Sequence, residues 1–157
     1  MAKQYILPPI SLTERKDYTA RIRAWNEAYT QETGKQRKCF VLTFGCQQNV
    51  ADSEKLSGMC EAMGYELTDR AEEADLIMVN TCAVREHAEK KALSLIGQYK
   101  HCKNAKKELV IAVCGCMVKQ EHIAKKFRQS YPFVDIVFGT HAAPRLPELV
   151  YKHITAK

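Results

Sequence analysis

The sequence lacks any apolar run long enough to place it in a membrane. Its longest uninterrupted apolar segment covers residues 109–114, which is far too short to span a bilayer. The first nine residues carry neither the apolar stretch nor the cleavage site of a signal peptide. We therefore expect a cytoplasmic protein without a membrane partner, in a compartment where thiols stay reduced.

Several signatures of catalysis and of metal binding are also absent. The chain has no glycine-rich phosphate loop, no serine nucleophile motif, and no pair of carboxylates placed for general acid–base catalysis. It has no C-x-x-C pair, which structural zinc sites usually contain. With 157 residues, 46% hydrophobic and 27% charged, it is long enough and apolar enough to fold as one compact domain.

Cysteine, in contrast, is abundant, with seven residues in the chain. Three of these, Cys46, Cys82 and Cys116, each follow a short apolar run and each precede a helical pattern. The intervals between them are nearly equal, 36 residues (82 − 46) and 34 residues (116 − 82). In a reducing compartment, cysteines in such a repeated context more often bind metal or take part in chemistry than form disulfides.

The apolar runs predict five strands, and helical patterns separate them. Two of these runs are apolar throughout, as expected for strands that are buried on both faces of a parallel sheet. We predict an α/β fold with three layers and a mostly parallel five-stranded sheet, flavodoxin- or Rossmann-like, with strand order 2-1-3-4-5. The expected strands are residues 39–44, 65–67, 76–79, 109–113 and 134–138. The expected helices are residues 52–63, 84–100, 119–130 and 146–153.

An extra N-terminal helix precedes this pattern. Ser11 and Glu14 form a capping box at its start, and Gly34 is placed to end it. We assign residues 1–37 to an N-terminal extension with this amphipathic helix, which either packs on the domain or awaits a partner. Residues 38–157 form the main domain.

The predicted strand order places the strands before Cys46, Cys82 and Cys116 side by side. Because crossovers are right-handed, the carboxyl ends of these strands lie on one edge of the sheet, where α/β proteins bind ligands. Three thiolates there indicate a shared metal or iron–sulfur site. The residues leave its type open: zinc, with four ligands expected, or a cubane cluster with one iron that has no protein ligand.

The remaining cysteines have structural explanations. In a parallel strand, Cys114 is expected to face the packed core rather than the loop. Cys60 lies on the apolar stripe of the predicted helix 52–63, whose start Asp52 or Ser53 can cap. Cys102 is expected to be a lone thiol in a lysine-rich loop.

Positive charge is concentrated in the second half of the chain. The net charge is +6, and residues 84–130 contain eleven Lys and Arg against four Glu. This balance suits a phosphate-bearing partner, although a solvated helix surface rich in lysine is a common alternative.

The cysteine motifs resemble those of a known family. The resemblance is to the N-terminal domain of the radical-SAM methylthiotransferases and covers roughly residues 38–152. Its motifs are TFGCQQNVADSE (43–54), ADLIMVNTCAVRE (74–86) and GCM (115–117), with VDIVFGT (134–140) and LPE (146–148) extending the match. The pair Arg85-Glu86 resembles the branch that modifies tRNA more than the branch that modifies a ribosomal protein. The family usually has methionine at the position of Gln48.

The resemblance implies a cofactor, a reaction and partners. Cys46, Cys82 and Cys116 would hold one [4Fe–4S] cluster through three thiolates. The whole enzyme would add a methylthio group to carbon 2 of an isopentenylated adenosine beside the anticodon of tRNA, with S-adenosylmethionine as methyl donor and radical source.

Two domains of this family are missing from the 157 residues. Family members continue into a radical-SAM barrel with a C-x-x-x-C-x-x-C motif and then an RNA-binding domain, and this chain has no such motif. We therefore expect a monomeric fragment that is inactive alone and contacts tRNA mainly through the missing domains. The alternative, in a different class, is a non-catalytic metal-binding or interaction module.

Overall fold

The computed structural model describes residues 3–4, 11–44, 47–81, 86–115 and 121–156. Its strands form one parallel sheet in the spatial order β1-β6-β5-β4-β2-β3. They are β1 (Lys3–Gln4), β2 (Lys38–Thr43), β3 (Glu66–Leu67), β4 (Leu76–Thr81), β5 (Val110–Gly115) and β6 (Ile136–Phe138). Apart from β1, this order is the predicted 2-1-3-4-5. The two-residue strand β1, too short to leave a periodic pattern, was not predicted.

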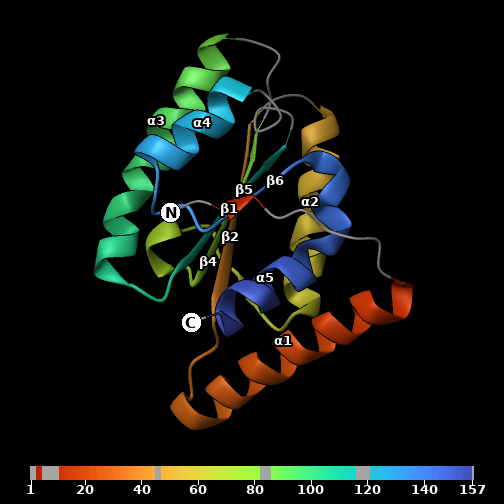
Figure 1. The fold of residues 1–157 in the computed structure, drawn as a ribbon. Helices are drawn as coiled ribbons and strands as arrows, with labels where there is room; N and C mark the ends of the chain where they lie inside the picture. The colour runs from red at the N-terminus through yellow and green to blue at the C-terminus, as the bar shows by residue number, and fades with distance from the viewer. Residues whose placement is uncertain (1–2, 5–10, 45–46, 82–85, 116–120, 157) are drawn as a thin grey trace.

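Helices cover both faces of the sheet and complete three layers (Figure 1). The helices are α1 (Leu12–Thr33), α2 (Gln47–Ala62), α3 (Glu86–Ala105), α4 (Glu121–Ser130) and α5 (Leu146–Thr155), with two 3₁₀ turns, η1 (Ala71–Glu73) and η3 (Thr140–Arg145). Helices α3 and α4 lie on one face, and α2 and α5 lie on the other (Figure 1). The α/β class predicted from the sequence is therefore confirmed.

The central strands are buried on both faces, and alternate residues supply two apolar clusters. In β4, Ile77 and Val79 pack with side chains of α3 and α4, whereas Leu76 and Met78 pack with side chains of α2 and α5. All four side chains are fully buried. The uniformly apolar run in the sequence reflects this two-sided burial.

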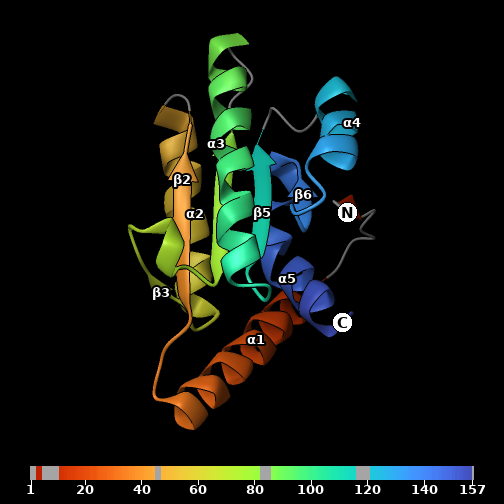
Figure 2. The ribbon, with the colours of Figure 1, turned by 90° about the vertical axis from the view of Figure 1, so that its left-hand side faces the viewer.

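Helix α1 packs on the outside of the layer formed by α2 and α5, and these two helices are its main neighbours (Figures 1 and 2). The Ser11 hydroxyl accepts from the Glu14 N–H at 3.1 Å, and Gly34, with φ 74°, ends the helix as predicted. Ile22 is fully buried, and the Asn26 amide donates to the Met63 carbonyl at 2.8 Å. Of the two roles considered for this helix, packing on the domain is the one observed.

Two local predictions were wrong. Helix α2 begins at Gln47 rather than at residue 52, so Asp52 and Ser53 lie inside the helix and do not cap it. Cys102 lies on α3, which continues to Ala105, and not in a loop. In both places the chain offers polar residues that suit a loop and also a solvated helix face, and packing against the sheet decides between them.

Candidate metal centre at the carboxyl edge of the sheet

The predicted ligands Cys46, Cys82 and Cys116 lie outside the described residues, so the structure places the strands that lead to them. Strands β2, β4 and β5 are immediate neighbours in the sheet. Strand β4 ends at Thr81, directly before Cys82, and β5 ends at Gly115, directly before Cys116. Strand β2 ends at Thr43, three residues before Cys46.

These three strands end level with one another. In the register of the sheet Thr43 lies beside Asn80, Asn80 beside Cys114, and Thr81 beside Gly115. The N–H of Phe44 also donates to the carbonyl of Asn80 at 2.8 Å, which extends the pairing one residue past the end of β2. Strand order reverses between β2 and β4, because β3 follows on one side and β5 on the other. Such a switch point is where doubly wound sheets bind ligands.

Both the backbone conformation at position 115 and the neighbouring end of β4 require glycine there. Gly115 has a φ of 109°, a conformation that favours glycine. A Cβ atom at this position would lie 2.3 Å from the carbonyl oxygen of Thr81. Any side chain would therefore push apart the two strands that lead to Cys82 and Cys116.

A largely buried polar network links the ends of β2 and β4 to α2, and the end of β4 to that of β5. The Ser53 hydroxyl oxygen accepts from Thr43 Oγ1 at 2.6 Å and from Asn80 Nδ2 at 3.1 Å. Thr81 Oγ1 donates to the carbonyl of Cys114 at 2.7 Å. Sequence reasoning missed this network, because Ser53 was expected to cap a helix. Its one available signal was the polar pair Asn80-Thr81 at the end of an otherwise apolar strand.

Cys114, Cys60 and Cys39 are buried in the core. Cys114 is 2% exposed, as expected for a side chain that faces the packed layer, and burial raises its pKa to about 12. Cys39 Sγ lies 3.2 Å from Cys60 Sγ, and this hydrogen bond together with burial raises the pKa of the Cys39 thiol. A thiol held protonated in this way is a poor metal ligand.

The described part of the chain offers no competing metal site. No group of three or more His, Cys, Asp or Glu side chains in that part is arranged to hold a metal ion. The three predicted cysteines, which lie outside that part, stay the candidate ligands at the carboxyl edge, and thiolate sulfur suits iron–sulfur clusters. Three strand ends that lie level and adjacent fit such a group.

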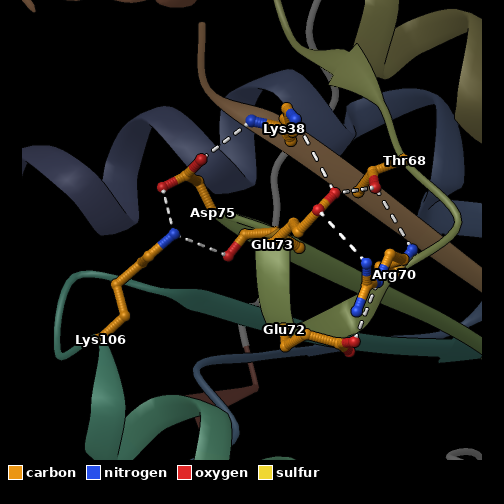
Figure 3. A network of polar contacts seen from close by, with 8 residues as sticks. Lys38, Thr68, Arg70, Glu72, Glu73, Asp75 and Lys106 are labelled. Atoms are coloured by element: carbon orange, nitrogen blue, oxygen red, sulfur yellow. Dashed lines mark hydrogen bonds and ion pairs between the residues drawn. The ribbon is translucent and has the colours of Figure 1, made fainter. Parts of the chain in front are cut away.

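The opposite, amino edge of the sheet carries a network of charged side chains (Figure 3). Asp75 accepts from the backbone N–H of Lys38 at 2.9 Å and pairs with Lys106 Nζ at 3.1 Å. Glu73 accepts from Thr68 Oγ1 at 3.1 Å and lies between Lys38 and Arg70. These contacts join β2, the turn before β4 and the segment after α3. The network therefore serves to hold these parts of the fold together.

A cleft of about 270 Å³ lies beside this network, between α1 and the amino ends of the strands. In it the Arg37 guanidinium lies 3.5 Å from the centre of the Trp25 ring and 3.9 Å from that of Tyr29. Arg37 also donates to Asn26 Oδ1 at 3.3 Å. The guanidinium is thus held by this chain's own side chains, and it fastens α1 to the start of β2.

Comparison with known proteins finds a family match that includes the carboxyl edge. Residues 38–139 match the family described as "Uncharacterized protein family UPF0004". The chain belongs to family UPF0004. The matched range contains β2, β4 and β5 together with Cys46, Cys82 and Cys116.

Curated relatives of this UPF0004 chain carry a specific name. A protein of Clostridioides difficile (strain 630) is 45% identical over 154 residues, which are 98% of this chain and 32% of the relative. A protein of Caldicellulosiruptor saccharolyticus is 47% identical over 148 residues, covering 94% of this chain and 31% of the relative. Both are named tRNA-2-methylthio-N(6)-dimethylallyladenosine synthase.

The chain spans about a third of the length of these relatives. Among the described residues, no helix combines the length and the apolar character needed to cross a membrane.

Proposed function

We propose that this chain is the N-terminal cluster-binding domain of a tRNA methylthiotransferase. The observation that carries the proposal is the level, adjacent ending of β2, β4 and β5 just before Cys46, Cys82 and Cys116. The names of the relatives agree with it. Residues 1–37 are then an N-terminal extension, and residues 38–157 are the cluster-binding domain.

The three cysteines hold one [4Fe–4S] cluster in this proposal. Three thiolates for four irons would leave one iron without a protein ligand, where an exogenous sulfur atom or substrate could bind. The role of this chain is to supply the thiolates and hold them at a fixed separation at the carboxyl edge. Helix α2 begins directly after Cys46, at Gln47, and its N-terminal partial charge favours a thiolate at that position.

The complete enzyme adds a methylthio group to carbon 2 of an isopentenylated adenosine next to the tRNA anticodon. S-adenosylmethionine and a second cluster belong to a radical-SAM domain outside these 157 residues, and an RNA-binding domain follows it. We therefore propose that this chain alone is inactive, monomeric and cytoplasmic. The two relatives described above are both named for tRNA, which favours this substrate over a ribosomal protein.

Iron content after anaerobic reconstitution tests the proposed ligands. The unchanged chain is expected to bind about four irons with the brown colour of a cubane cluster. Replacing any one of Cys46, Cys82 or Cys116 with alanine should abolish most of this binding. Cys102→Ala is the matched control, because Cys102 is a half-buried thiol on α3 outside the predicted ligand set.

A chain with Cys82→Ala that keeps a full cluster would contradict the ligand assignment. Binding of a single zinc ion in place of iron under the same conditions would favour the metal-binding module instead. Aerobic preparations do not distinguish the two, since oxygen can remove an exposed cluster.

A further inference from the structure

Polar side chains are concentrated in the core beneath the carboxyl edge. Five polar or charged residues are buried in the described part of the chain, and three of them, Ser53, Asn80 and Thr81, lie at this edge. The two core clusters on either side of the sheet consist of apolar side chains. Burying a polar group costs free energy even when it is partly compensated by hydrogen bonds. Three such groups at one place therefore indicate that this part of the core needs directional contacts, which apolar side chains do not provide.

We propose that the strand-end network, defined as Thr43, Ser53, Asn80, Thr81 and Gly115, positions the three cysteines for a shared cluster. This inference rests on the proposed function and adds to it residues that do not themselves bind the cluster. Thr43 and Asn80 both donate to Ser53 on α2, Thr81 donates to the carbonyl of Cys114 in β5, and Gly115 lies against the backbone of Thr81.

The first half of the network fixes the path to Cys46. Thr43 is the last residue of β2, and its hydroxyl bonds to Ser53 on α2. The segment that carries Cys46 runs between this strand and this helix, so the bond holds both of its ends. Because Ser53 also accepts from Asn80, the same hydroxyl links this segment to β4.

The second half fixes Cys82 relative to Cys116. Thr81 and Gly115 are paired in the register, and each directly precedes one of these cysteines. The Thr81 hydroxyl bonds to the carbonyl of Cys114, and the absence of a side chain at Gly115 allows the close approach of the two backbones. The two chains therefore leave the sheet at neighbouring positions.

Directional bonds suit this task better than apolar contacts do. A cluster tolerates little variation in the separation of its thiolates, and groups that orient metal ligands typically change metal affinity about 10–100-fold when they are removed. Apolar packing of similar volume would bury the strands equally well but would make no directional contact between their ends.

Four substitutions in the 157-residue chain test this role. Ser53→Ala removes the shared acceptor, and Ser57→Ala removes a hydroxyl one turn later on the same helix. Thr43→Val removes the donor to Ser53 but keeps the shape of the side chain, whereas Thr43→Ser keeps the donor. Each variant is reconstituted anaerobically, and we measure the release of iron to a chelator, the electron paramagnetic resonance signal of the reduced cluster, and the thermal unfolding midpoint without iron.

Ser53→Ala and Thr43→Val are expected to release iron about tenfold faster than the unchanged chain and to alter the resonance signal. Ser57→Ala and Thr43→Ser should behave like the unchanged chain. The inference is overturned if Ser53→Ala and Thr43→Val only lower the unfolding midpoint, with unchanged iron release and signal. It is also overturned if Thr43→Ser loses iron as fast as Thr43→Val. If the unchanged chain and Ser57→Ala take up no iron, the proposed function fails and this inference fails with it.

Discussion

At the scale of single residues, the environment separates the described cysteines by reactivity. Cys114 and Cys39 are buried and their thiol pKa values are raised, for Cys114 chiefly by burial and for Cys39 chiefly by its hydrogen bond to Cys60. Burial also raises the pKa of Cys102, although this thiol is only half-buried. In each case the environment of the thiol favours its protonated form.

Alkylation of the folded chain measures this difference for Cys114. Its pKa is raised from 9.0 to about 12, so near pH 8 its thiolate fraction is about a thousandfold lower than in the unfolded chain. We expect iodoacetamide to label Cys114 much more slowly in the native protein than in urea, and Cys102 to be labelled faster than Cys114. Below the pKa, the rate at Cys114 should rise about tenfold per pH unit.

Mass spectrometry of peptides at successive times gives these rates. Labelling of Cys114 as fast as that of Cys102 in the native chain would show that the carboxyl edge opens readily, against the packing described here.

At the scale of elements, α1 is joined to the domain by a few specific contacts. Ile22 is its fully buried apolar residue, Asn26 bonds to the Met63 carbonyl, and Tyr18 packs against Tyr151 of α5 with ring centres 5.5 Å apart. Much of the remaining helix surface is exposed, including Leu12 at 62%. The attachment of α1 therefore depends on a narrow stripe of its surface.

Ile22→Ala tests how much this stripe contributes to stability. Removing a fully buried isoleucine side chain is expected to lower the free energy of unfolding by about 2–5 kcal/mol. Leu12→Ala on the same helix removes a comparable side chain that is mostly exposed, so we expect a change of less than about 1 kcal/mol. Urea unfolding followed by circular dichroism measures both. Equal effects of the two substitutions would mean that α1 is not packed as described.

In the whole molecule, the two edges of the sheet and its helix-covered face carry different kinds of side chains. The carboxyl edge contains the ends of the three strands that precede Cys46, Cys82 and Cys116. The amino edge carries the charged network (Figure 3) and the cleft next to α1. Helices α3 and α4 share one face (Figure 1) and carry exposed basic residues. These basic residues are Lys90, Lys91, Lys100, Lys125, Lys126 and Arg128.

If tRNA is the substrate of the complete enzyme, this face is expected to give the chain weak affinity for tRNA that falls steeply with salt. Lys125→Gln combined with Lys126→Gln should weaken binding and reduce the slope of log affinity against log salt by about 1 for each phosphate that is no longer neutralised. The control, Lys16→Gln combined with Lys55→Gln, removes the same charge from α1 and α2. Fluorescence anisotropy with labelled tRNA at several salt concentrations measures both.

An equal decrease in affinity in the two double variants would show that net charge alone attracts tRNA. Tight binding that does not change with salt would contradict the expectation that most RNA contacts lie outside this chain.

The order of the five strands β2 to β6 could be predicted from the sequence, which also supplies the three candidate cysteine ligands. Apolar runs such as residues 76–79 indicate strands that are buried on both faces. The repeated strand–cysteine–helix units indicate the order of the strands. Both features can therefore be inferred from the sequence alone. The burial of Cys114 followed from the same reasoning.

How the strand ends are joined depends on contacts between residues that lie far apart in the sequence. The role of Ser53 depends on Thr43 and Asn80, which lie 10 and 27 residues away along the chain. The need for glycine at position 115 depends on the backbone of Thr81, which arrives from another strand. Apart from the polar pair Asn80-Thr81, the sequence gives no local sign of these contacts, because Ser53 resembles a helix cap and Gly115 resembles a turn residue. Packing places their partners beside them, and packing is a property of the assembled sheet.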